Sequence, residues 1–168
     1  MKTQSIIIAA MFCFIFGNVS AQEKELKAKS PNEIENISNI ESLMNSKTFE
    51  FVANTAYPSS GIPKNLVGSN YSITFSPEKI VSNLPFYGRA YSGMALGRDK
   101  GMRFQGIPEN FIIEKNKEYQ GSATVNAEND TYEISLSVSN SGYATLAISS
   151  NDRGTISYQG EIVETKKQ

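Results

Sequence analysis

The sequence predicts a mostly β fold with one N-terminal amphipathic helix. The strands are expected to form an antiparallel meander that closes into a barrel, for example a lipocalin-like one, or packs into a sandwich. After Lys47, apolar residues recur at every second position, which is typical of strands with one buried and one solvated face. Before Lys47 the apolar spacing is near 3.6 residues. Short turns rich in Asn, Asp and Gly separate the alternating segments, which favours hairpins.

The first 21 residues are expected to be a cleavable secretory signal peptide. Lys2 precedes an apolar stretch, Ile6 to Phe16, and Val19-Ser20-Ala21 offers small side chains for a signal peptidase. The apolar stretch is too short to span about 30 Å of hydrocarbon as a helix. Cys13 has Met11-Phe12 before it, which does not fit a lipoprotein signal. We therefore expect the protein in the periplasm or secreted.

The charged segment 22–30 is expected to be a flexible lead, and residues 31–168 a single all-β domain with a leading helix. The helix is predicted over residues 31–46, because Ser30 can cap it and Pro31 fits its first position. The face expected to pack on the sheet includes the apolar residues Ile34, Ile37 and Leu43.

Eight or nine strands are predicted, and residues 110–163 read as a meander of four or five of them. Glycine is dense between Gly88 and Gly106, which favours loops and bulges over long strands. The inward positions are expected to be Phe49, Phe51, Ala53, Tyr71, Ile73, Phe75, Tyr132, Ile134, Leu136, Val138, Ala144, Leu146, Ile148, Ile156, Tyr158 and Ile162.

Several segments resemble a family of secreted Gram-negative bacterial proteins, the domain of unknown function 4251 family. The most distinctive segment is Leu84-Pro85-Phe86-Tyr87-Gly88-Arg89-Ala90-Tyr91. Others are 49–53, Gly101-Met102-Arg103-Phe104 and 153–162, and the resemblance covers roughly residues 32–163. It implies an exported all-β domain with a leading helix and implies no activity.

The candidate ligand-binding residues are Tyr87, Arg89, Tyr91 and Arg103. An arginine between two tyrosines can hold an anionic or sugar ligand by bidentate hydrogen bonds and ring stacking. The alternative is that Arg89 pairs structurally within an aromatic-rich strand, which is the commoner arrangement. Arg103 belongs to a cluster of charges, 98–103, that could receive an acidic ligand or simply form a solvated loop.

The composition excludes several chemistries. The chain has no His and one Cys, which the signal cleavage would remove, so imidazole catalysis, disulfides and most zinc sites are excluded. No catalytic residue, metal site or cofactor is predicted: residues 151–154 lack the ligand spacing of a calcium loop, and no pair of glutamates stands out as a glycosidase pair. A formal net charge of −1 argues against nucleic acid.

These observations favour an exported, non-catalytic binding or interaction module of the bacterial envelope. Its partner would be a small molecule, a glycan or a protein, with no integral membrane segment after signal removal. Two alternatives stay open at this point, a carboxylate-dependent hydrolase and a purely structural envelope component. An aromatic-lined cavity would favour a ligand, a flat apolar patch a protein partner, and two buried acids in a cleft hydrolysis.

Overall fold

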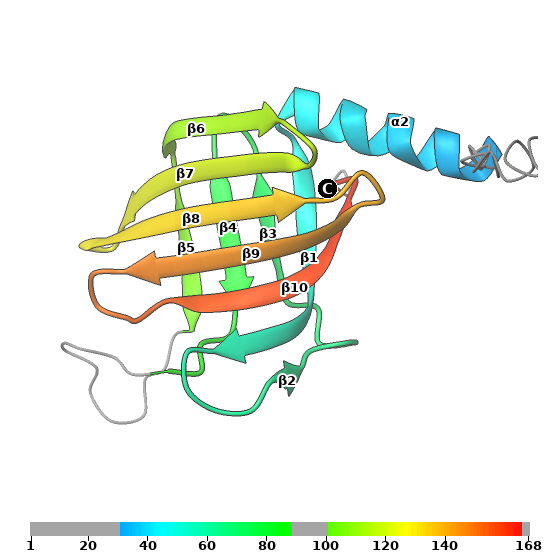
Figure 1. Ribbon diagram of the computed structural model, residues 1–168. Coiled ribbons are helices and arrows are strands. Elements are labelled where there is room, and N and C mark those ends of the chain that lie inside the picture. The colour runs from blue at the N-terminus through cyan, green and yellow to red at the C-terminus, as the bar shows by residue number, and fades with distance from the viewer. Residues whose placement is uncertain (1–30, 89–100, 166–168) are drawn as a thin grey trace, which may run out of the picture.

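The computed structural model describes residues 31–88 and 101–165, and side chains from residue 35 onward. Its helix and strands are shown in Figure 1. They are α2 (Pro31–Ser46), β1 (Phe49–Pro58), β2 (Lys64–Asn65), β3 (Ser72–Phe75), β4 (Ile80–Leu84), β5 (Met102–Gly106), β6 (Pro108–Lys115), β7 (Tyr119–Ala127), β8 (Asp130–Val138), β9 (Tyr143–Ser150) and β10 (Ile156–Val163).

Nine of the strands form one continuous antiparallel path in the order β5-β4-β3-β1-β10-β9-β8-β7-β6, and the short β2 pairs with β1. In Figure 1 the path wraps into two layers, with β3, β4 and β5 behind and running across β6 to β10 in front. Gly106 at the end of β5 lies against Val125 of β7, which brings the two ends of the path together. The predicted mostly β, antiparallel, barrel-like fold is therefore confirmed.

Strand β1 belongs to both layers, because it bends in its middle. Its first half pairs with β3 and its whole length with β10, and the register with β10 shifts between Ala53 and Thr55. Such a bulge bends a strand and increases its twist. At the bend, Gly160 of β10 lies so close to the carbonyl of Val52 that a side chain there would overlap it. The absence of a Cβ at residue 160 is thus what lets the two strands approach.

The space between the layers is filled by the apolar side chains of the alternating segments. Phe49, Phe51 and Tyr158 are almost completely buried, as the period of two predicts. Towards one end, Phe75 stacks between Phe49 and Phe111, with ring centroids 4.9 and 5.9 Å apart. The domain is therefore held by a packed core without the help of disulfides.

The helix has the predicted bounds, but it is anchored only by its C-terminal half. Figure 1 shows α2 projecting away from the barrel towards its N-terminus. Ile40 is 3% exposed and packs on Gly142 in the β8–β9 turn, whereas Ile37 is only partly buried. The side chain of Ile34 lies outside the described part. Of the residues expected to pack on the sheet, Leu43 is buried, but Ile37 is only partly buried, because the helix projects from the barrel on the N-terminal side of Ile40.

Two polar contacts tie the helix region to the edge strand β6. Lys115 forms an ion pair with Glu41 of the helix at 2.6 Å, and Lys47 donates a hydrogen bond to the Phe111 carbonyl at 2.8 Å. The hydrogen bond from Lys47 occupies a backbone carbonyl of β6, which among the described strands pairs only with β7. Asn110, with φ of 53°, also bulges this strand. Both features make β6 a poor template for pairing with another chain.

Candidate functional site

The predicted arginine–tyrosine site is described only in part. Tyr87 is partly buried and packs against the core, next to the buried Phe86. Arg103 is exposed on β5, in the layer of β3, β4 and β5. Arg89 and Tyr91 lie outside the described residues. A ligand site built from these four residues therefore stays a prediction.

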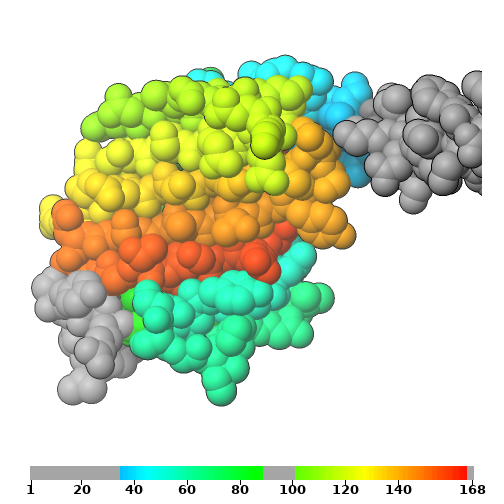
Figure 2. All heavy atoms as spheres, viewed as in Figure 1, coloured from blue at the N-terminus to red at the C-terminus, as the bar shows by residue number. Residues whose placement is uncertain are grey.

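A different place on the molecule carries a cleft. It has a volume of about 470 Å³ and lies on the outer face of the other layer, the face that Figure 2 presents to the reader. We call it the outer cleft. Its lining consists of Asn54, Thr55, Glu118, Ser137, Ser139, Tyr143, Ala144, Thr145, Gln159 and Gly160.

The register of the sheet explains why these residues meet. Gln159 of β10 is paired with Thr55 of β1 on one side and with Thr145 of β9 on the other. Thr145 is in turn paired with Ser137 of β8, which is paired with Gln120 of β7. A row of outward side chains therefore crosses five strands. Thr55 and Gln159 are about 100 positions apart in the sequence, whereas the other paired residues of this row face each other across hairpins.

Several polar groups of the outer cleft are held in place by hydrogen bonds. The Tyr57 hydroxyl donates to Gln159 Oε1 at 2.8 Å. The Ser137 hydroxyl donates to Glu118 Oε2 at 3.0 Å and accepts from Gln120 Nε2 at 2.9 Å. Tyr143 differs from these residues, because its side chain is 71% exposed. The cleft thus combines oriented amide and hydroxyl groups with one open aromatic ring.

The sheet that carries the outer cleft has an unusual charge distribution. Residues 118–165 contain a single cationic side chain, Arg153, and it is buried. The outward positions of β8 and β10 include the exposed Glu133 and Glu161, and Glu118 lines the cleft itself. The outer face of β7 to β10 is therefore negative, and anionic ligands are disfavoured there.

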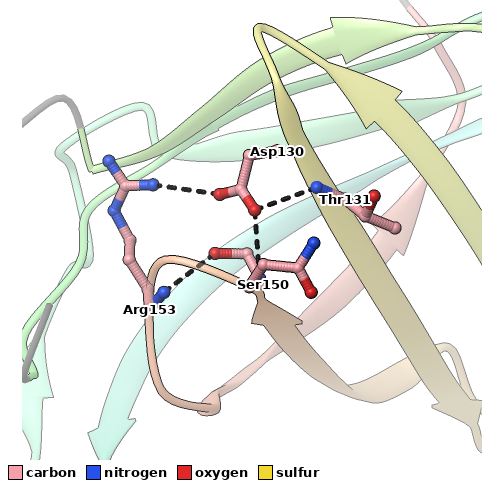
Figure 3. Close-up of polar contacts among 5 residues, drawn as sticks. Asp130, Thr131, Ser150 and Arg153 are labelled. Carbon is pink, nitrogen blue, oxygen red and sulfur yellow. Dashed lines mark hydrogen bonds and ion pairs between the residues drawn. The ribbon is translucent and has the colours of Figure 1, made fainter. Parts of the chain in front are cut away.

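Arg153 belongs to a buried cluster at the opposite end of these strands, shown in Figure 3. Its guanidinium lies 3.6 Å from the carboxylate of Asp130, and the two side chains are 9% and 4% exposed. Asp130 Oδ1 also accepts hydrogen bonds from the backbone N–H groups of Thr131 and Asn151, at 2.9 and 3.0 Å. The cluster joins the β7–β8 turn to the β9–β10 turn, so its role is structural.

Tyr132 lies beside the Asp130–Arg153 cluster and stacks on Phe104, with ring centroids 4.0 Å apart. Burial raises the pKa of the Tyr132 phenol, the Asp130 carboxylate raises it further, and the Arg153 guanidinium acts in the opposite direction. The phenol is therefore neutral over the physiological range. Arg153 lies in the turn between β9 and β10, as residues 151–154 indicate, and its burial against Asp130 is an additional feature that the turn sequence does not reveal.

Within residues 31–88 and 101–165, no three His, Cys, Asp or Glu residues gather as metal ligands would. In the same ranges, no helix has the length and apolar character needed to cross a bilayer. Of the glutamates on strands, Glu50 is partly buried, while Glu114, Glu133 and Glu161 are exposed, so none of these four is buried as a catalytic acid would be.

Comparison with known proteins identifies the family. The family model described as "Domain of unknown function (DUF4251)" matches residues 32–162. The chain belongs to the DUF4251 family. A crystal structure of a DUF4251 family protein from Bacteroides eggerthii has a similar fold, with a TM-score of 0.60 over 77% of this chain and 88% of that one. At 14% identity this similarity shows the fold alone. No curated protein matches this DUF4251 chain.

The outer cleft could not be predicted from the sequence, because its outward residues have the pattern of an ordinary solvated strand face. Thr145 and Gln159 are ordinary polar positions in an alternating pattern, and only the register places them side by side. One signal was nevertheless present in the sequence. A run without any Lys or Arg from residue 118 to residue 152 is uncommon in a solvated sheet, where charged side chains are abundant.

Proposed function

We propose that this protein is an exported, non-catalytic binding module of the bacterial envelope, and that it holds its ligand in the outer cleft. The observation that carries the proposal is the cleft itself. Its volume of about 470 Å³ is within the range of ligand sites, and oriented polar groups surround an exposed tyrosine ring. Such a combination suits recognition, because the polar groups need little reordering when a ligand arrives.

Binding is favoured over hydrolysis by the composition of the lining. A glycosidase-type reaction needs two carboxyl groups on either side of the bond that is cut. Glu118 is the one carboxylate in the lining of the outer cleft, and it already accepts a hydrogen bond from Ser137. The absence of histidine from the whole chain also removes the commonest general base.

Export is supported by the sequence of the N-terminus. Lys2, the apolar stretch and the small residues at 19–21 form the three parts of a secretory signal. The fold has a packed core and needs no cysteine, so it is compatible with an oxidising or a reducing compartment. A binding module placed outside the cytoplasm would meet nutrients, envelope polymers and other exported proteins.

The test is native mass spectrometry of the protein purified from its own envelope. We expect an additional mass on the wild-type protein and its loss in Thr145→Trp, because the indole would fill the centre of the outer cleft. Val81→Trp is the matched control, since Val81 is an exposed strand residue in the layer of β3 to β5. Thermal melting must show that both variants fold. A ligand that Thr145→Trp retains, or no ligand at all, would count against the proposal.

A further inference from the structure

We infer that the outer cleft binds a neutral, extended oligosaccharide, lying across the strands of the sheet. The inference rests on the proposed function and names the class of ligand. It draws on the shape of the cleft, its charge, and the kinds of groups that line it. Each of these three properties independently excludes some classes of ligand.

The shape favours an elongated ligand. The lining includes residues of β1, β10, β9 and β8, and Glu118 just before β7. Neighbouring strands are about 4.8 Å apart, so five strands span roughly 19 Å. Because the floor of the cleft is the outer surface of a sheet, a chain can lie across several strands at once. A compact metabolite would contact only part of the lining.

The charge of the cleft disfavours anionic ligands, and the lining offers few carboxylates to a cationic ligand. No Lys or Arg lines the cleft, and β7 to β10 carry none on their outer face. The exposed Lys64 and Lys117 lie near its two ends but outside the lining, so an anionic polymer would meet Glu118 with no cation inside the cleft. A cation would find one carboxylate in the lining, whereas hydroxyl and amide groups are more numerous there. Neutral ligands rich in hydroxyl groups match this balance best.

The functional groups divide into a ring for stacking and partners for hydrogen bonds. The open ring of Tyr143 offers an apolar face with a polar edge, which suits a sugar that has one face of C–H groups. Gln159 receives the Tyr57 hydroxyl on Oε1, which fixes the amide and leaves its Nε2 to donate to a ligand. Tyr57 is thus a positioning residue in this site.

Isothermal titration calorimetry on the purified mature protein tests the inference. The probes are neutral hexasaccharides of glucose, xylose, mannose and N-acetylglucosamine, with oligogalacturonate as the anionic probe and spermine as the cationic one. We expect at least one neutral probe to bind. Tyr143→Ala should weaken its binding by about tenfold or more, which corresponds to about 1.4 kcal/mol.

Further variants separate direct contact from positioning. Gln159→Ala should weaken binding about as much as Tyr143→Ala, and Tyr57→Phe should weaken it less, because the amide stays but is no longer fixed. Ile62→Ala is the control, since Ile62 is an exposed apolar residue of the loop after β1 and should leave binding unchanged. Thermal melting of each variant shows whether a loss of binding reflects a loss of fold.

Three results would overturn the inference. They are binding of spermine or oligogalacturonate alone, no binding of any neutral probe at millimolar concentration, and neutral binding that Tyr143→Ala leaves intact. The proposed function is tested by a different result. If native mass spectrometry finds a ligand that Thr145→Trp displaces and that ligand is not a carbohydrate, the binding module stands and the oligosaccharide does not.

Discussion

Replacement of Gly160 by alanine tests the geometry that bends β1 and shapes one side of the outer cleft. A Cβ at residue 160 would overlap the carbonyl oxygen of Val52 and lie 2.9 Å from its carbonyl carbon. The obstacle is backbone in a paired strand, so it cannot rotate away as a side chain could. Overpacking of this kind costs about 1 to 3 kcal/mol. We expect the upper part of that range for Gly160→Ala.

Gly121 supplies a matched control, because it is also a strand glycine of the same sheet. A Cβ there would lie 3.4 Å from Leu136 Cβ and 3.7 Å from the Ile112 carbonyl oxygen, which is ordinary contact. Glycine in a strand costs about 0.5 to 1 kcal/mol relative to alanine. Gly121→Ala is therefore expected to be neutral or to stabilise the fold by about 0.5 kcal/mol.

The assays are thermal and urea unfolding, both followed by tyrosine fluorescence, since the chain has eight tyrosines and no tryptophan. For a domain of this size, 1 kcal/mol corresponds to a shift in Tm of about 4 °C. Gly160→Ala should thus lower Tm by about 10 °C, with an unchanged urea dependence. If Gly160→Ala is as stable as the wild type, or if both variants lose the same amount, the close approach of β1 and β10 is not as described.

Four further outcomes follow from the structure. Asp130→Ala should lower the free energy of unfolding by about 3 kcal/mol in urea titrations, because it breaks a buried charge pair. Burial raises the pKa of Tyr132, so the folded state holds its proton more tightly; stability should fall as pH rises above about 10, and Tyr132→Phe should reduce that fall. Ile40→Asp should cost about 3 kcal/mol in thermal melts and Ile37→Asp clearly less, since Ile37 is only partly buried. Intact mass of the exported protein should correspond to a chain that begins at Gln22, and a lipid adduct would refute this.

Local patterns were sufficient to predict the meander of residues 110–163 and the helix bounds, whereas β5 lies in the glycine-dense segment that was expected to form loops. The alternation of Tyr132, Ile134, Leu136 and Val138 marks β8, and all four residues are buried. The turn at Glu128 and Asn129 has positive φ values of 53° and 68°, as residues prone to this conformation suggest. These features depend on a few consecutive residues, which is why a single sequence reveals them.

The bend of β1 and the outer cleft depend on contacts between distant residues. The bulge at Asn54 is matched to Gly160, and nothing near Asn54 in the sequence indicates the partner. In the same way, the sequence around Arg153 indicates a turn but not that Asp130 lies opposite it. Register and burial at such places are set by the whole sheet, so local periodicity cannot supply them.

The pairing of β1 with β10 also determines when this chain can finish folding. The first strand of the barrel pairs with β10, and in addition to the backbone ladder a side-chain hydrogen bond from Tyr57 to Gln159 joins residues 102 positions apart. Closing such a long loop carries a large entropic cost that neighbouring hairpins do not share. The hairpins from β6 to β10 can form early, but β1 cannot complete its pairing until β10, far along the chain, is available. A chain in which the two strands have not yet paired stays open along both edges of that seam, and deletion of β10 should leave it in this aggregation-prone form.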